Sequence, residues 1–435
     1  MTTPRVERSP ILEQIAADFA QRVESSNGHA NPELHALRRQ AFDEFQRLGI
    51  PTVRHEEWKY ANLFPLLAKG FHLPPHRTEL PSLDAVLAPL RRWGRVVPLL
   101  DGQLLPYQDE PDLLQPLSEA LRDQRWFERV GRLAPFEGNA IVAWNAAFFA
   151  GGFVLRVTNE RTEPIVAVSV LDGRGGNVAV HERHLLEVAP GASLVLVLVQ
   201  RVLGEGEALL NQVLEGWIGE NASLTLVIVQ DAPQTAHAIT THELELARSA
   251  RLELITVSIG GGFLRNMPAA RLVGEGADAQ LYGLTLADGS MLVDHHTTVE
   301  HRVAHCTSNE LYKAILDGRS TGVFNGKILV QPNAQKTSAY QANRNIVLSS
   351  RATINTKPQL EIFANDVRCT HGCTVGRLDR EALFYLRSRG LSKQEAEALL
   401  LAAFAEEITA KVPIESLRTD LNAHIEHLLH ADELA

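Results

Sequence analysis

Apolar and polar residues alternate in short runs across the middle of the chain, and these runs recur at a nearly constant interval. Four tetrapeptides with alanine second and leucine fourth begin the runs, and the alanines lie 30, 28 and 29 residues apart, at Ala192, Ala222, Ala250 and Ala279. Each tetrapeptide follows a short turn and opens a run such as LVLVLVQ or LTLVIVQ. Strands at a constant period, with no helical pattern between them, predict a β-solenoid in which each repeat forms one coil.

Two other folds also contain many short strands. A leucine-rich repeat has a similar period, but its asparagine-centred pattern is absent from this sequence. An immunoglobulin-like or jelly-roll sandwich would supply the strands without explaining the recurring tetrapeptide. The favoured prediction is therefore a mainly β protein with a solenoid core.

Helix signals precede the repeats. Ser-Pro at 9–10 comes before the periodic stretch ILEQIAADFAQRV, and Asn-Pro-Glu at 31–33 offers an N-cap, a proline at the first helical position and an acidic first turn. The second helix is expected to end near Gly49, after which the chain is rich in proline and poorly periodic. The apolar run AIVAWNAAFFAGGFVL, residues 140–155, is too short to span a bilayer, and we expect it to form a buried core strand.

The last part of the chain predicts three more helices. Asp379 can cap the first, Gly390 follows it, and Ser392 with Glu395 forms a capping box for the second, while residues 415–430 give the third. The second helix carries an apolar stripe that must pack on the solenoid end, on its sister helices or on a partner. The stripe consists of Leu399, Leu400, Ala403, Phe404 and Ile408.

These patterns divide the chain into three expected regions. Residues 1–135 form an N-terminal helical and mixed region, residues 136–378 the β-solenoid core, and residues 379–435 a C-terminal helical domain.

Composition narrows the class of protein. The chain is 45% apolar, and 42 Lys and Arg against 52 Asp and Glu give a net charge of −10 with no basic block, which argues against a nucleic-acid partner. The opening MTTPRVERSP lacks the layout of a secretory signal, and three cysteines do not make a disulfide framework. We therefore expect a soluble cytoplasmic protein without a membrane partner.

The sequence also lacks the common catalytic motifs. No P-loop, Gly-x-Ser-x-Gly or Cys-x-x-Cys motif occurs, so no self-contained active site is expected.

Two of the three cysteines lie in CTHGCTVG, residues 369–376. On a strand, Cys369, His371 and Cys373 would project from one face with a valine on either side. Side chains at alternate positions are about 6.6 Å apart, which suits two neighbouring metal ligands better than one ion held by all three. The alternative is a core face with two buried cysteines. Spacing alone leaves both possibilities open.

A second polar concentration is DHHTTVEHRVAHCTSNELYK, residues 294–313. Its imidazoles and thiol suit zinc or iron, but they fall on both faces of any strand, so surface or hydrogen-bonded histidines are the alternative. The candidate ligands are His295, His296, His301, His305 and Cys306.

Residues 355–408, NTKPQLEIFANDVRCTHGCTVGRLDREALFYLRSRGLSKQEAEALLLAAFAEEI, closely resemble the SufB/SufD family of iron–sulfur cluster assembly scaffolds. GVFNGKI at 322–328, HRVAHCTSNELYKAIL at 301–316 and RHEEWKYANL at 54–63 support the resemblance. It implies a right-handed parallel β-helix flanked by helical regions, acting as a non-catalytic scaffold. It also implies a SufB-type partner bound through the β-helix ends and a SufC-type ABC ATPase bound by the C-terminal helices, with nucleotide on SufC only. A homodimer stays open.

Within the family the residues resemble SufD. SufB members have a functional cysteine where this chain has Ala352, and Glu-His-Glu where this chain has Thr-His-Gly at 370–372. The resemblance implies that His371, with Cys369 as its companion, binds a transient iron–sulfur cluster shared with SufB. Cys373 departs from the family pattern, which has a small residue there, so its part as a third metal ligand rests on residue type alone.

Two further hypotheses are kept beside the scaffold. A β-helix enzyme such as a polysaccharide lyase would line a groove on the coil exterior with charged residues. A purely structural partner would use residues 369–373 for packing only.

Overall fold

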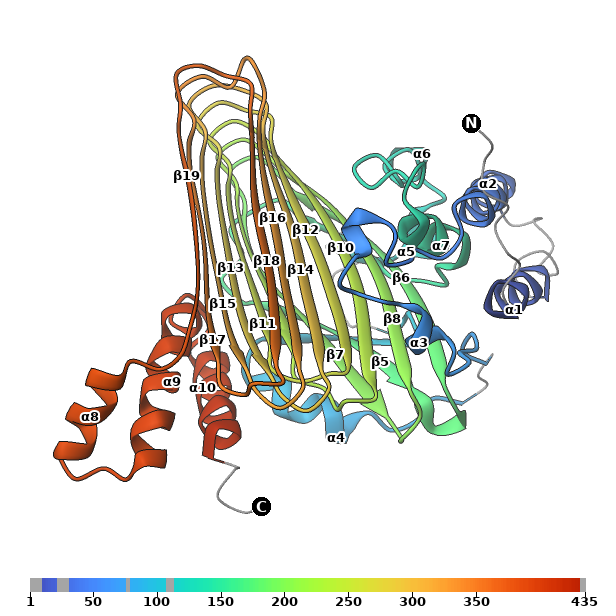
Figure 1. Ribbon diagram of the computed structural model, residues 1–435. Coiled ribbons are helices and arrows are strands. Elements are labelled where there is room, and N and C mark those ends of the chain that lie inside the picture. The colour runs from blue at the N-terminus through green and yellow to red at the C-terminus, as the bar shows by residue number, and fades with distance from the viewer. Residues whose placement is uncertain (1–9, 22–30, 76–78, 107–112, 431–435) are drawn as a thin grey trace.

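The computed structural model describes residues 10–21, 31–75, 79–106 and 113–430, and they form a β-solenoid with helices on either side (Figure 1). From β4 (Phe153–Val157) onward the chain alternates between two sheets, so that each strand pairs in parallel with the second strand after it. One sheet has ten strands in the order β2 (Gln103–Leu104), β1 (Arg95–Leu100), β5 (Ile165–Asp172), β7 (Ser193–Leu203), β9 (Ser223–Gln230), β11 (Arg251–Ser258), β13 (Asp278–Ala287), β15 (Thr307–Leu316), β17 (Ser338–Val347) and β19 (Arg368–Gly376).

The other sheet has nine strands and faces the first across the lumen. Its order is β3 (Leu114–Pro116), β4 (Phe153–Val157), β6 (Val178–Val188), β8 (Ala208–Ile218), β10 (Ala236–Leu246), β12 (Phe263–Leu272), β14 (Leu292–His301), β16 (Thr321–Val330) and β18 (Thr353–Ile362). Only the two outermost pairs, β1 with β2 and β3 with β4, are antiparallel among the described strands. The predicted parallel solenoid is confirmed.

The alanines of the repeat lie buried at the corner where the chain enters each strand of the ten-stranded sheet. The carbonyl of Ala192 accepts from Ser223 N, and that of Ala222 accepts from Arg251 N, so these positions stack as predicted. The prediction for the fourth alanine, Ala279, is wrong by two positions. Ala279 pairs with Leu252, and Ala277 stacks on Ala250, so this coil takes 27 residues rather than 29. Only Ala279 fits the tetrapeptide pattern, because Ala277 has alanine rather than leucine two residues later, and only the pairing of the strands shows that Ala277 takes the corner.

Leucines fill the lumen in columns that run along the solenoid. Leu196, Leu226, Leu254 and Leu281 pair in register on four successive strands, and each is at most 1% exposed. Burial of one leucine side chain stabilises a fold by about 1.5–3 kcal/mol. Each coil therefore adds to a continuous core, and the side chains of one coil cover those of the next.

The N-terminal helices pack on the nine-stranded sheet. They are α1 (Pro10–Phe19), α2 (Pro32–Leu48) and α7 (Ala140–Phe148). The side chain of Asn31 caps α2 as predicted, accepting from Leu34 N at 2.9 Å, and Gly49 ends it. Residues 22–23 of the first predicted helix lie outside the described residues.

The strand predicted over residues 140–155 is wrong. Residues 140–148 form α7, which is buried from Ile141 to Phe148, and strand β4 begins only at Phe153. A helix that is enclosed on all sides shows the same unbroken apolar run as a buried strand. The local signal for the helix is Asn139, whose side chain accepts from Ile141 N and Val142 N.

Short helices lie between these elements. They are η2 (Glu56–Trp58), α3 (Phe64–Leu67), α4 (Asp84–Leu87), η3 (Ala88–Arg92), α5 (Leu117–Ala120), α6 (Gln124–Phe127) and η4 (Gly173–Gly175).

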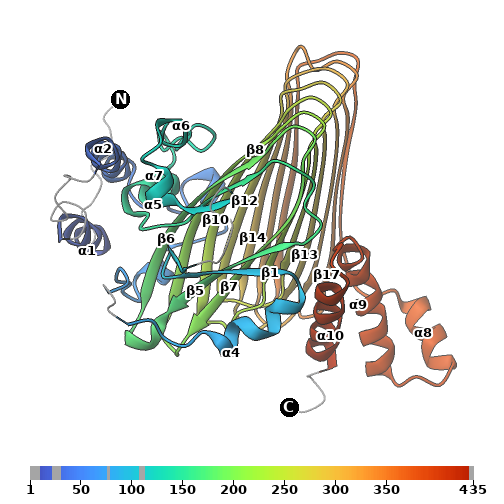
Figure 2. The same cartoon turned by 180° about the vertical axis from the view of Figure 1, so that it is seen from behind.

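Three C-terminal helices, α8 (Arg380–Ser388), α9 (Lys393–Thr409) and α10 (Glu415–His430), lie on the other side of the solenoid from the N-terminal helices (Figures 1 and 2). The predicted cap at Asp379 and the capping box of Ser392 with Glu395 are both present. Of the expected stripe on α9, Ile408 is buried, Leu400 and Phe404 are half-buried, and Leu399 and Ala403 are exposed. The side of α9 packed against the ten-stranded sheet carries Leu401, Ala405 and Ile408. None of the described helices is both long enough and apolar enough to cross a bilayer.

Candidate functional site

The solenoid ends in an open coil at its C-terminal side. Strands β19 and β18 are the last of their sheets, and no described strand pairs with their outer edges (Figure 1). After Gly376 the chain leaves the solenoid and begins α8 at Arg380. Side chains that point into the lumen elsewhere are therefore uncovered here, and Val375 is 53% exposed.

Residues 369–376 lie on strand β19, and Cys369, His371 and Cys373 share its inward face. Cys369 pairs with Ala339, His371 with Gln341 and Cys373 with Asn343 on the preceding strand β17. Cys369 is half-buried against the cluster around Ile328 and Val330, whereas His371 and Cys373 are exposed. A core face with two buried cysteines is thus wrong for Cys373, because no further coil covers it.

The open coil presents a histidine and two cysteines, which are residue types that can bind metals, on one face. Within the described ranges, no three side chains of His, Cys, Asp and Glu come close enough together to hold an ion. Adjacent positions on this face are about 6.6 Å apart along the strand. Burial raises the pKa of the Cys369 thiol, although a hydrogen bond from the backbone of Ala339 opposes this. A metal would have to displace that proton, and ligands from elsewhere would have to complete the site.

Glu310 and Gln341, two polar residues that belong to no recognisable motif, lie below His371. The inward column that carries leucines in earlier coils continues as Glu310, Gln341 and His371 on β15, β17 and β19. Glu310 is fully buried; Thr297 Oγ1 donates to its Oε2 at 2.5 Å and Gln341 Nε2 to its Oε1 at 3.0 Å. Burial raises the pKa of Glu310 to about 7. The available signal was a charged residue where the repeat places leucine.

The histidine-rich segment does not form a metal centre. His295 and His301 point into the lumen, where they meet Thr285 Oγ1 at 3.1 Å and Ser308 Oγ at 2.9 Å, and burial lowers the pKa of both to about 4. His296 lies on the outer face, and His305 is in an exposed turn with φ +61°. The metal-site hypothesis for this segment is therefore wrong, and hydrogen-bonded histidines are what the structure shows.

Cys306 belongs to the solenoid corner. Thr307 N donates to Ala277 O, and Ser338 N donates to Cys306 O, so Cys306 takes the corner position that alanine fills in the preceding coils. The side chain is fully buried, Sγ lies 3.3 Å from Gly274 O, and burial raises the pKa of the thiol. Cys306 thus has a packing role and lies two coils below β19.

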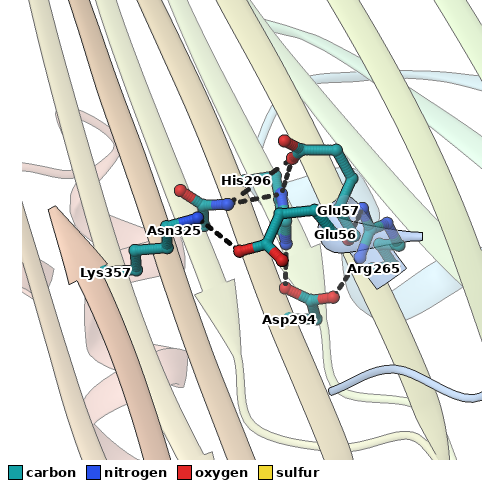
Figure 3. Close-up of polar contacts among 7 residues, drawn as sticks. All are labelled: Glu56, Glu57, Arg265, Asp294, His296, Asn325 and Lys357. Atoms are coloured by element: carbon teal, nitrogen blue, oxygen red, sulfur yellow. Dashed lines mark hydrogen bonds and ion pairs between the residues drawn. The ribbon is translucent and has the colours of Figure 1, made fainter. Parts of the chain in front are cut away.

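RHEEWKYANL, which we call the anchor segment (residues 54–63), lies on the outer face of the nine-stranded sheet (Figure 3). Arg265 on β12 donates to Glu57 O at 2.7 Å, forms an ion pair with Asp294, and lies 3.9 Å from the centroid of the Trp58 ring. Lys357 on β18 holds Glu56 with Nζ 2.6 Å from Oε1. The segment therefore spans several coils and ties them together.

His296 lies at the centre of this anchor. Its Nδ1 is 3.1 Å from Glu57 Oε2, and its Nε2 is 3.0 Å from Asp294 Oδ1. Burial alone would lower the pKa of His296, but the two carboxylates outweigh it and raise the pKa above its ordinary value. Each ring nitrogen of His296 faces a carboxylate, so the protonated ring links Glu57 to Asp294 and has no lone pair for a metal in that state.

Two family models match this sequence. The model described as SUF system FeS cluster assembly, SufBD core domain, covers residues 170–404, and the SufBD protein N-terminal region covers residues 11–85. The iron–sulfur cluster assembly protein SufD of Escherichia coli is 29% identical over 393 residues, which is 89% of this chain and 91% of the relative. The SufBD family protein slr0076 of Synechocystis is 39% identical over 439 residues, which is 96% of this chain and 95% of the relative.

Proposed function

The chain belongs to the SufBD family of iron–sulfur cluster assembly proteins, and from this premise we propose that it is a SufD-type scaffold subunit. Its partners would be a SufB-type paralogue and a SufC-type ATPase, and it would perform no catalysis of its own. The observation that carries the proposal is the open last coil, which presents His371 beside Cys369 and Cys373. The relatives are assembly proteins, which favours this function over a β-helix carbohydrate-active enzyme.

The SufB-type partner is assigned to the open coil. The outer edges of β18 and β19 present unpaired backbone groups, and exposed edges of this kind pair readily with another chain. Large apolar side chains lie at the same end of the solenoid: Tyr340 is 46% exposed and Phe363 60%. A second β-solenoid or a second copy of this chain would cover both the edge and these side chains.

The ATPase is assigned to the C-terminal helices. None of the residues of α8 is buried, and Phe384 and Tyr385 on this helix are 76% and 56% exposed. Leu399 on α9 is 49% exposed, on the side turned away from the solenoid core. Exposed aromatic residues of this kind are typical of protein interfaces. Nucleotide chemistry belongs to the partner in this proposal, because the sequence has no P-loop.

At the interface, His371 would contribute an imidazole to a cluster whose other ligands come from the partner and from Cys369 or Cys373. A neutral imidazole adds no charge to a thiolate–sulfide cluster. Three free cysteines in the chain fit a reducing compartment, so we place the complex in the cytoplasm.

The test is to replace His371 by alanine and co-purify the chain anaerobically with its SufB-type and SufC-type partners. We expect an intact complex with reduced iron and sulfide content. His35→Ala on α2, on the other side of the solenoid, is the control and should keep both at the wild-type level. Unchanged iron and sulfide in the His371→Ala complex would contradict the role of His371.

A further inference from the structure

The inward column below His371 changes character in the last three coils. Leu254 and Leu281 are followed in register by Glu310, Gln341 and His371. In-register residues on neighbouring parallel strands are about 4.8 Å apart, and their side chains point the same way. Each of these three polar side chains therefore lies next to the one below it.

Gln341 has a free acceptor on this column. Its Nε2 donates to Glu310 Oε1 at 3.0 Å, but Oε1 has no hydrogen-bond partner within the described residues, although Gln341 is 0% exposed. A buried amide oxygen without a partner is uncommon and costs free energy. Gly326 on the opposite sheet leaves room for this amide, since a Cβ there would lie 2.4 Å from Gln341 Nε2.

The neighbouring columns differ. Asn343, which pairs with Cys373, donates to Tyr312 O at 3.2 Å and accepts from Asn345 Nδ2 at 2.6 Å. Asn345 keeps a free oxygen, but its partner in register is Val375, which has no polar group. A free buried acceptor and an imidazole adjoin only on the column of Gln341 among these three.

We propose that Gln341, held by Glu310, is a positioning residue for His371: Gln341 Oε1 accepts the N–H of one ring nitrogen and thereby presents the other nitrogen to a metal. Metal-binding histidines generally donate their second ring N–H to a carbonyl or carboxylate, which fixes the tautomer and the ring orientation. The inference rests on the proposed function, in which His371 is a ligand.

Glu310 fixes the orientation of the Gln341 amide. Because its carboxyl oxygen accepts from Gln341 Nε2, the amide oxygen is the group left for the next coil. Thr297 in turn holds the other carboxyl oxygen of Glu310. The exposed ring of His371 is not hydrogen-bonded to Gln341 in the free chain, and rotation of that side chain completes the contact.

The experiment uses the full-length chain with 15N-labelled histidine, alone and in complex with its partners. Ring-nitrogen shifts report the tautomer of His371, whose signals are assigned by their loss in His371→Ala, and Co²⁺ absorption reports metal binding. The variants are Gln341→Leu, which removes the acceptor, and Glu310→Gln, which keeps an oxygen that can accept from Gln341. Asn345→Val is the matched control, because it also removes a buried amide from β17.

We expect Gln341→Leu to abolish the fixed tautomer of His371 and to weaken Co²⁺ binding by about 10-fold or more, the usual effect of losing such a partner. Glu310→Gln should retain both properties, and Asn345→Val should change neither. If Gln341→Leu does not fold, Gln341→Asn replaces it, because the shorter amide cannot reach both neighbours.

Wild-type tautomer and Co²⁺ affinity in the Gln341 variant would overturn the inference. Co²⁺ binding that is unchanged in His371→Ala would instead show that the proposed function is wrong, so the two failures are distinguishable. Equal loss of the tautomer in Asn345→Val would also overturn the inference, since the effect would then be general disturbance of β17.

Discussion

The amine of Lys313 on β15 joins the outer face of the solenoid to Glu407 on α9, with Nζ 2.5 Å from Glu407 Oε2. The amine also donates to Phe404 O at 2.7 Å and lies 3.9 Å from the centroid of the Phe404 ring. Lys313 is 4% exposed, so the charge is almost fully desolvated, while Glu407 remains partly in water. This contact fixes the C-terminal helices on the ten-stranded sheet.

Replacing Lys313 by methionine should loosen the C-terminal helices. The methionine side chain keeps the apolar length but loses two polar contacts and one cation–π contact, so we expect the free energy of unfolding to fall by about 1–3 kcal/mol. Relative to the wild type, amide hydrogen exchange should become faster in α9 and should stay unchanged in the solenoid strands. Lys393→Met is the control, because Lys393 is exposed and forms only a surface pair with Glu397 at 3.6 Å. Equal exchange in both variants would contradict a docking role for Lys313.

The anchor segment makes a second prediction, centred on Arg265. Replacing Arg265 by leucine removes the ion pair between Arg265 and Asp294, leaves the buried carboxylate with His296 as its neighbour, and removes the cation from the Trp58 ring. Loss of one partner of a buried pair typically costs about 3–5 kcal/mol. Urea unfolding followed by tryptophan fluorescence measures the loss.

The control for Arg265 is Arg248→Leu, which removes an exposed pair with Glu220. It should change the free energy of unfolding by less than about 0.5 kcal/mol, as surface substitutions usually do. An anchor that contributes nothing would give the same small value for Arg265→Leu.

His296 predicts a pH dependence of the anchor. Its pKa is raised in the folded chain, so its contribution is fully present below the unfolded value of 6.5 and is lost as the pH rises through the folded pKa. The stability difference between wild type and His296→Gln should therefore be larger at pH 6 than at pH 9. The buried histidines have lowered pKa values, so their effect on stability changes with pH in the opposite direction to that of His296. Both proteins contain these histidines, so subtracting the stability of His296→Gln from that of the wild type cancels their effect.

The acid side of the same anchor depends on Asp294 and Glu57. Their pKa values are lowered in the folded chain, so their contribution is present above the ordinary carboxyl values and is lost as the pH falls through the folded ones. The anchor segment thus contributes most to stability between the pKa values of its carboxyl groups and the pKa of His296. Urea unfolding at several pH values checks this window, and a difference that grows steadily above pH 7 would be inconsistent with it.

The three thiols should react in an order set by their positions. Cys373 is exposed and should react first with a thiol reagent, whereas the half-buried Cys369, with its raised pKa, should react more slowly. Cys306 should react only when the chain unfolds. Cys306→Ala should cost less than about 1.5 kcal/mol, because alanine fills this corner in neighbouring coils. Rapid labelling of Cys306 in the native chain would show that the corner is open.

Several elements could be predicted because their signals are local. The caps at Asn31, Asp379 and Ser392 satisfy backbone groups within a few residues, so the sequence contains the whole interaction. The strand expected over residues 140–155 was wrong because the apolar run alone does not contain the signal that decides between helix and strand. A buried helix and a buried strand look alike when the surroundings that bury them are distant in sequence.

Local alternation thus determined the solenoid, its strands and the shared face of Cys369, His371 and Cys373, because side chains alternate on any strand. Tertiary structure alone decided the pairing of Ala277 with the corner of the preceding coil, the placing of Gln341 beneath His371, and the exposure of the last coil. These relationships join residues about one coil apart, and their register depends on how whole strands pack together, which no short stretch of sequence contains.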